Sequence, residues 1–166
     1  MNITLIGMPA AGKSVIGVLL AKSAGLNFVD TDLVIQKQEK RLLKEIIAQE
    51  GLDGFLAIEN QVNASLAVDN CVIAPGGSVV YGGDAMEHLK AISTVVYLKI
   101  SCEELKIRLG DLKDRGVALK DGMTLEDLYE ERIPLYEKWA DFVVDEHEKT
   151  PGMLVAEIRE KLSVGK

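Results

Sequence analysis

Glycine, lysine and serine residues are closely spaced in the segment GMPAAGKS, residues 7–14, between a strand-like apolar run and an apolar helix pattern. The spacing matches G-x-x-x-x-G-K-S, in which glycines let backbone N–H groups converge on phosphate oxygens. Lys13 can reach the terminal phosphates of a nucleotide, and the Ser14 hydroxyl can bind Mg²⁺. The segment therefore predicts a site for the triphosphate of a nucleotide, rather than a glycine turn that only packs. The residues expected to bind the nucleotide here are Gly7, Ala10, Ala11, Gly12, Lys13, Ser14 and Val15.

Two aspartates follow the second apolar run, as Asp30 and Asp32 in the segment FVDTD. In an extended backbone, residues two apart leave the same face, so both carboxylates face one space. Phosphoryl transfer needs carboxylates for two tasks: one holds Mg²⁺ directly or through its water, and the other accepts the proton of the attacking hydroxyl. The alternative is that one aspartate caps the following helix. No Glu or Gln lies three residues after Asp30, Thr31 or Asp32 to complete a capping box.

Five short apolar runs alternate with longer amphipathic stretches, and we predict strands at NITLI, NFVD, CVIA, TVVYLKI and DFVVD. Strands that are apolar throughout and alternate with helices indicate an α/β fold, with a parallel sheet covered on both faces. Ligands of such sheets bind beyond the carboxyl ends of the strands. The residues that follow each strand are therefore the candidate site, and the 166 residues are expected to form one domain.

The overall composition narrows the range of partners. A formal net charge of −7 argues against nucleic acid or an anionic membrane as partner, because a phosphate polymer requires a basic face. Two cysteines give neither a disulfide framework nor metal-ligand spacing, and no apolar run reaches membrane-spanning length. The apolar N-terminal segment lacks the positive region of a secretion signal. We expect a cytoplasmic monomer whose partners are small molecules.

With the segments DTD, FLAIE, APGG, DRGVAL and ERIPLY following the glycine-rich loop in this order, the chain resembles the shikimate kinase family from end to end. The resemblance implies a three-layer P-loop NTPase fold, with a five-stranded parallel sheet in the order 2-3-1-4-5 and helices on both faces. It also implies a single P-loop kinase domain over residues 1–166, with a substrate-binding region at about 30–62 and a lid at about 110–122.

The resemblance implies roles for residues around the acceptor. Asp32 matches the aspartate that binds the substrate hydroxyl and is the proposed base, and Asp30 matches the aspartate that holds a magnesium-bound water. Gly76 and Gly77 match the glycines whose backbone meets the substrate, and Arg132 matches an arginine that binds the substrate carboxylate. Taken alone, Arg132 would as readily be a solvated surface charge.

Roles toward the nucleotide follow in the same way. Arg108 and Pro151 match the pair between which the adenine ring stacks, and Arg115 matches the lid arginine that approaches the phosphates. A planar guanidinium suits both a purine face and a phosphate group. The alternatives are solvated surface charges for both arginines, a solvated loop in place of the lid, and for Pro151 the first position of the last helix after a Thr150 cap.

One acidic residue lies on an otherwise apolar helix face. Phe55, Glu59, Val62 and Leu66 share a face by their spacing, and a carboxylate there needs a partner or a ligand. Glu59 also matches the glutamate in the F-R-x-x-E motif of the family. We therefore expect it near the substrate pocket.

The acceptor half of the chain departs from the family pattern. Leu56 stands where the family has an arginine that binds the shikimate carboxylate. Ser78 takes the third place of a glycine triplet, Pro75 precedes that triplet, and Gly116 replaces a proline after the lid arginine. Loss of one hydrogen bond to a charged group weakens binding by roughly ten- to a hundredfold. That penalty is large enough to favour another acceptor, yet too small to exclude shikimate while Arg132 remains.

These residues together predict a kinase that uses ATP and Mg²⁺ to phosphorylate a hydroxyl of shikimate or a related polyhydroxy acid. Lys13 and Arg115 would offset charge on the moving phosphoryl group, Ser14 and Asp30 would hold the metal, and Asp32 would deprotonate the acceptor. The alternatives are a different alcohol acceptor, such as gluconate, homoserine or a nucleoside monophosphate, or a catalytically weak ATP-binding regulator.

Overall fold

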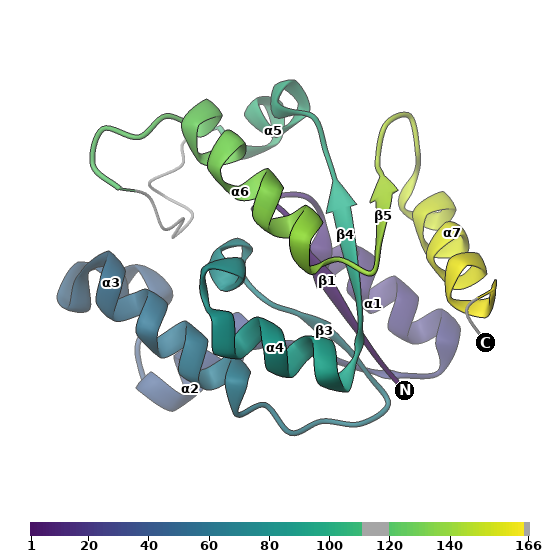
Figure 1. Ribbon diagram of the computed structural model, residues 1–166, viewed down its shortest axis with the longest axis horizontal. Helices are drawn as coiled ribbons and strands as arrows, with labels where there is room; N and C mark the ends of the chain where they lie inside the picture. Colours follow the sequence, from purple (N-terminus) through teal and green to yellow (C-terminus); the bar gives the residue numbers. More distant parts are fainter. Residues whose placement is uncertain (111–119, 165–166) are drawn as a thin grey trace.

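The computed structural model describes residues 1–110 and 120–164 (Figure 1). Within this part of the chain, five parallel strands form one sheet in the order β2-β3-β1-β4-β5, which confirms the predicted topology. The strands are β1 (Asn2–Ile6), β2 (Asn27–Asp30), β3 (Cys71–Ala74), β4 (Thr94–Lys99) and β5 (Phe142–Asp145).

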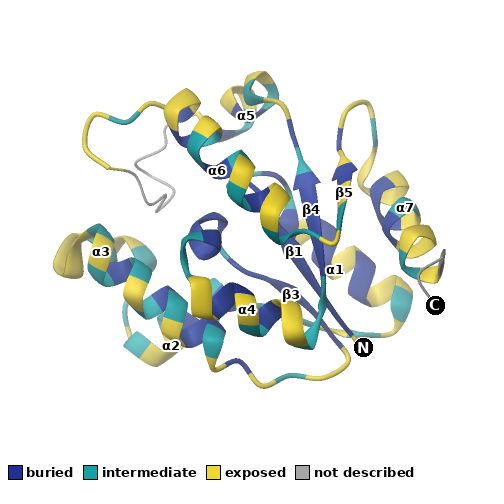
Figure 2. Ribbon diagram, in the orientation of Figure 1, coloured by how far each residue is buried: buried dark blue, intermediate teal, exposed yellow. Residues whose placement is uncertain are grey.

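The central strands are buried because helices cover both faces of the sheet. All residues of β1 and β3 are buried, and their side chains are mostly apolar and β-branched, as expected of strands with no face in water (Figure 2). The register places Thr4 of β1 opposite Ile73 of β3 and Val95 of β4. The carboxyl ends of these strands therefore meet at one edge of the sheet, where the loops that follow them converge.

The helices form the outer layers, with α1 and α7 on one face of the sheet and α4 and α6 on the other (Figure 1). Local sequence sets several ends: α1 stops at Gly25, which adopts a left-handed φ of 70°, and Thr124 caps α6 by accepting a bond from the backbone of Asp127. The bounds are α1 (Lys13–Ala24), α2 (Thr31–Glu39), α3 (Leu43–Ala64), the 3₁₀ helix η1 (Gly77–Tyr81), α4 (Gly83–Ile92), α5 (Cys102–Leu109), α6 (Leu125–Trp139) and α7 (Pro151–Val164).

Helices α2 and α3 form a side region with its own apolar cluster, which comprises Ile35, Ile46, Phe55 and Val62. Helix α3 is interrupted at Gly51, where φ is 73° and ψ is 177°. This break divides α3 into two helical segments, one on either side of Gly51. In the described residues, no helix is both long and apolar enough to cross a membrane.

Candidate active site

The loop between β1 and α1 has the backbone of a phosphate cradle. Gly7 has a φ of 154° and Gly12 a φ of 84°, backbone conformations that residues other than glycine rarely adopt. At Gly7 a Cβ would also lie 2.7 Å from the carbonyl oxygen of Leu98. Helix α1 begins at Lys13, so the loop presents its N–H groups at the positive end of a helix.

Lys13 is buried across this loop, where its Nζ donates to the carbonyl oxygens of Gly7 and Met8 at 2.8 Å each. Burial lowers the pKa of Lys13 to about 8, while the nearby carboxylates, Asp32 foremost, act to raise it. The ammonium group is therefore mostly charged at neutral pH and is held beside the space where a terminal phosphate fits.

Asp30 both caps α2 and lies beside the cradle. Its Oδ1 accepts a hydrogen bond from the backbone N of Asp32 at 2.9 Å, and its Oδ2 accepts one from the Ser14 hydroxyl at 3.3 Å. Asp30 therefore caps the helix, as the alternative interpretation predicts, and its second carboxylate oxygen still contacts Ser14. Two oxygen donors side by side suit Mg²⁺, which takes its other ligands from phosphates and water. Among the described residues, no group of three or more His, Cys, Asp or Glu side chains is arranged to hold a metal ion.

Asp32 is the second residue of α2, and its Oδ1 has no hydrogen-bond partner among the described residues. Burial and then the charge of Asp30 raise the pKa of Asp32 to about 6, while Lys13 acts to lower it. At neutral pH the carboxylate is mostly deprotonated, with an oxygen able to accept a proton or a hydrogen bond from a ligand.

The loop after β3 packs tightly against the charged side chains of the site. A Cβ at Gly76 would lie 2.8 Å from Asp32 Oδ1 and 3.0 Å from Glu59 Oε2, and one at Gly77 would lie 2.9 Å from Arg132 Nη1. Any side chain at Gly76 or Gly77 would thus displace these groups. The glycines therefore leave the backbone in contact with the space that the charged groups surround.

Glu59 and Arg132 complete the far side of the site, and each is 1% exposed. Glu59 accepts a 2.6 Å hydrogen bond from the Ser78 hydroxyl, and burial raises its pKa to about 7. Arg132 reaches in from α6, donates from Nε to the Tyr81 hydroxyl at 3.3 Å and lies over the ring of Tyr81.

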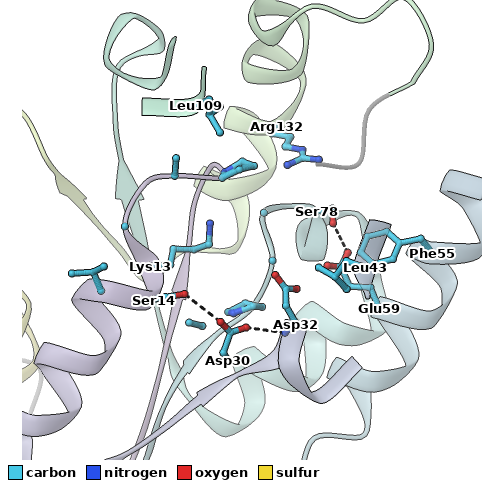
Figure 3. Close-up of a pocket in the computed structure, with 18 residues that line it drawn as sticks. Lys13, Ser14, Asp30, Asp32, Leu43, Phe55, Glu59, Ser78, Leu109 and Arg132 are labelled. Carbon is cyan, nitrogen blue, oxygen red and sulfur yellow. Dashed lines mark hydrogen bonds between the residues drawn. The ribbon is translucent and has the colours of Figure 1, made fainter. Parts of the chain in front are cut away.

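A cavity of about 330 Å³ joins these groups, and Figure 3 shows Lys13, Asp32 and Arg132 pointing into it from three different elements. Leu43 and Phe55 give it an apolar wall. Gly7 and Ala11 form the frame of the loop and do not line the cavity. The predicted residues that do line it are Ala10, Gly12, Lys13, Ser14, Val15, Asp30, Asp32, Glu59, Gly76, Gly77 and Arg132.

A second cavity, of about 810 Å³, lies beyond the carboxyl ends of β4 and β5 and is lined by Arg108 and Thr150 among others. Arg108 donates from Nη1 to the carbonyl oxygen of Ala10 at 3.2 Å, which connects this cavity to the cradle. Pro151 is the first residue of α7, and the Thr150 hydroxyl accepts from Met153 N, as the capping interpretation predicts. Pro151 itself does not line the cavity, although Thr150 before it does.

Glu146 is a residue of this region that the sequence analysis missed. It follows β5, is 8% exposed, and its Oε1 lies 3.4 Å from Arg108 Nη1. Burial raises its pKa to about 7. The sequence feature that could have identified Glu146 is its position directly after β5, because ligands of a parallel sheet bind beyond the carboxyl ends of its strands.

Two other predicted features are the lid and the substitution at Leu56. Arg115, Gly116 and most of the predicted lid at about 110–122 lie outside the described residues. Leu56 packs beside the apolar cluster of α2 and α3 and does not line the first cavity. The structure shows where the site residues lie, and the roles assigned to individual residues stay predictions.

A glycine-rich phosphate cradle at the centre of a 2-3-1-4-5 parallel sheet, opening on a cavity that contains an aspartate, defines a P-loop phosphotransferase. The family model for shikimate kinase matches residues 9–163, and the chain belongs to the shikimate kinase family.

Relatives and solved structures agree with this assignment along the whole chain. The shikimate kinase of Pseudomonas paraeruginosa is 38% identical over 98% of this chain and 96% of its own length, and that of Mycobacterium avium is 39% identical over 95% and 91%. The solved shikimate kinase of Acinetobacter baumannii, in complex with shikimate, has a TM-score of 0.91 at 29% identity, covering 99% of this chain and 94% of its own. A gluconokinase from Sinorhizobium meliloti, at 17% identity and a TM-score of 0.56, covers 99% of this chain and 97% of its own, and shares the fold alone.

Proposed function

We propose that this protein transfers the γ-phosphoryl group of ATP to a hydroxyl group of shikimate or a related polyhydroxy acid. The observation that carries the proposal is the single cavity in which Lys13 and Ser14 of the cradle meet Asp32 and Arg132. The shikimate-bound structure from Acinetobacter baumannii, which is similar over almost the whole chain, supports the choice of acceptor.

The reaction follows from the positions of these side chains. Arg132 binds the acceptor carboxylate through its planar guanidinium, and the backbone at Gly76 and Gly77 lies against the acceptor. Asp32 takes the hydroxyl proton as the acceptor oxygen bonds to the γ-phosphorus and the bond to the β-phosphate oxygen breaks, leaving ADP. Lys13 leaves the loop carbonyls that it contacts and offsets charge on the moving group.

The nucleotide side of the proposal rests on both cavities. The Ser14 hydroxyl and the Asp30 carboxylate would hold Mg²⁺, which supplies neutralising charge on the phosphates when bound. Arg108 and Pro151 would enclose the adenine ring at the second cavity, and Arg115 would approach the phosphates from the lid. We also infer that the protein works as a monomer in the cytoplasm.

The test is ATP turnover against a panel of acceptors with Mg²⁺ present, with each product identified by mass spectrometry. The panel comprises shikimate, quinate, gluconate, homoserine and nucleoside monophosphates. We expect phosphorylated shikimate or quinate as the preferred product. A preference for homoserine or a nucleoside monophosphate would refute the proposed acceptor. ATP binding without any phosphorylated product would favour the alternative of a catalytically weak ATP-binding regulator.

A further inference from the structure

The guanidinium group of Arg132, which points into the first cavity from α6, is held by tyrosines from two elements (Figure 3). Its Nε donates to the Tyr81 hydroxyl at 3.3 Å, and its Cζ lies 5.3 Å from the centre of the Tyr81 ring. Burial raises the pKa of Tyr136 to about 12, while the charge of Arg132 and a hydrogen bond with it act to lower that pKa. Neither tyrosine lines the cavity, so each can act on a ligand there only through Arg132.

Each tyrosine hydroxyl has a single proton, and in both cases another residue accepts it. The Tyr81 hydroxyl donates to Glu131 Oε2 at 3.3 Å, and the Tyr136 hydroxyl donates to the carbonyl oxygen of Gly77 at 2.7 Å. The lone pairs of both oxygens are therefore left to accept from Arg132, whose guanidinium can only donate. The negative charge of Glu131 also strengthens the bond that the Tyr81 oxygen accepts from the cation.

The two tyrosines differ in how much of the fold depends on them. Tyr136 is fully buried, stacks on the ring of Tyr97 at a centroid distance of 5.1 Å and belongs to the main apolar core. Tyr81 is half-buried at the end of η1 and belongs to neither apolar cluster. Its hydroxyl bonds to two consecutive residues of α6, Glu131 and Arg132, so its polar contacts are directed at Arg132 and the charge beside it.

The orientation of Arg132 has particular weight in this chain because α3 supplies no guanidinium group. Helix α3 contains no arginine, and Leu56, at the position of the family arginine, does not line the cavity. A guanidinium binds a carboxylate best when its donors meet both oxygens in one plane. An arginine that is already held in one orientation loses little side-chain freedom when the carboxylate binds.

We infer that Tyr81 is a positioning residue for the acceptor: its hydroxyl, polarised by Glu131, fixes the plane of the Arg132 guanidinium before the acceptor carboxylate binds. This inference rests on the proposed function and deepens it. Part of the affinity for the acceptor comes from a residue outside the cavity, and the acceptors that benefit are alcohols that carry a carboxylate.

The experiment compares the wild type with Tyr81→Phe, which keeps the ring beside Arg132 and removes only the hydroxyl group. Both proteins are assayed with shikimate and with its carboxamide, which lacks the negative charge that Arg132 binds. Ordering one long side chain on binding corresponds to roughly a twofold to tenfold change in affinity. We expect Tyr81→Phe to raise the KM for shikimate by about that factor, while kcat and the KM for ATP stay the same. The carboxamide should bind the wild type more weakly, and Tyr81→Phe should cause no further loss with it.

Variants of Glu131 separate positioning from packing. Glu131→Ala removes the group that accepts the Tyr81 proton, so the hydroxyl can turn away from Arg132 and the KM for shikimate should rise. Glu131→Gln keeps an acceptor oxygen and should recover most of the wild-type KM. Glu130→Ala is the matched control, since Glu130 is the neighbouring exposed glutamate of the same helix, and it should leave the KM for shikimate unchanged.

An unchanged KM for shikimate in Tyr81→Phe, or an equal rise with the carboxamide, would overturn the inference. If Tyr81→Phe does not fold, Glu131→Ala decides the matter by the same comparison of shikimate with the carboxamide. Equal wild-type KM values for the two acceptors would show that Arg132 does not bind the carboxylate, and would refute the inference while phosphoryl transfer stands. A wild type that phosphorylates no polyhydroxy acid would refute the proposed function itself, which the same assay detects before any variant is made.

Discussion

The phosphate-binding and acceptor-binding halves of the first cavity are built in different ways. The phosphate half comes from one continuous segment, residues 7–15, whose shape rests on backbone angles. The acceptor half takes Asp32 from α2, Glu59 from α3 and Arg132 from α6, together with the loop after β3. The shape of the cradle is determined by the order of adjacent residues. In the acceptor half, by contrast, a residue on one helix can change without altering the fold. Of the residues that depart from the family pattern, Ser78 lines the acceptor half, whereas Leu56 lies in α3 beside it and does not line the cavity.

Asp32→Asn tests the acceptor half by removing the base. We expect kcat to fall by about 10²- to 10⁴-fold while ATP affinity stays within a few-fold. Because burial and Asp30 raise the pKa of Asp32 to about 6, and a base works only without its proton, the wild-type kcat should rise as pH increases through about 6 and then level off. The variant should lose this inflection.

Steady-state rates between pH 5 and pH 8 and ATP titration by calorimetry check this expectation. The control is Asp53→Asn on the exposed surface of α3. An inflection that persists in Asp32→Asn would assign the base to another residue.

Lys13→Ala tests the phosphate half. The variant loses the charge that offsets the moving phosphoryl group, so we expect kcat to fall by about 10²- to 10³-fold and ATP affinity to weaken. The loss should be the same for every acceptor, unlike changes in the acceptor half. Lys22→Ala, exposed in the last turn of the same helix, is the control, and activity of Lys13→Ala within a few-fold of wild type would refute the role.

Leu56→Arg sharpens the comparison by adding a cation to the acceptor half. We expect the KM for shikimate to fall by up to about tenfold, because a second guanidinium adds a hydrogen bond to the carboxylate, while the KM for ATP stays constant. Leu56→Lys adds charge without the planar fork and should gain less. Titration that shows no gain with arginine would mean that the natural acceptor differs from shikimate.

Glu146→Gln gives the smallest expected effect, on stability. Burial raises the pKa of Glu146 from its usual value of 4.5 to about 7, so the folded protein binds this proton more tightly than the unfolded chain does. This group therefore stabilises the fold below about pH 4.5, and its contribution is lost as pH rises toward 7.

The variant should reduce the fall in the free energy of unfolding between pH 4.5 and pH 7 by on the order of 1 kcal/mol. Urea denaturation at both pH values measures it, with Glu87→Gln on the exposed face of α4 as control. An unchanged slope would show that Glu146 exchanges its proton equally in both states.

The parallel α/β architecture and the cradle could be predicted because each depends on local pattern, whereas the strand order 2-3-1-4-5 came from the resemblance to the shikimate kinase family. Strands that are buried on both faces appear as continuous apolar runs, and the glycines and Lys13 are adjacent in the chain. The expectation for Glu59 also came from local spacing, since it is the one carboxylate on an apolar helix face. Its position beside the cavity depends on α3 packing against the loop after β3, which spacing does not encode.

What could not be predicted depends on contacts between distant segments. Glu146 looks like part of a surface turn until β4 and β5 pair and bring it to Arg108, 38 residues away. The hydrogen bond from Ser78 to Glu59 joins η1 to α3, and the apolar pattern of α3 alone does not reveal which residue binds Glu59. Neither pairing leaves a periodic signature in the sequence.

The contacts of Lys13 with the carbonyl oxygens of Gly7 and Met8 have a consequence for nucleotide affinity. Folding has already removed this ammonium group from water. When a triphosphate binds, its oxygens replace the two carbonyl oxygens around the ammonium group, and little water has to be removed from Lys13 itself. The cost of dehydrating the cation is thus met during folding, and a larger share of the attraction between lysine and phosphate remains as binding free energy.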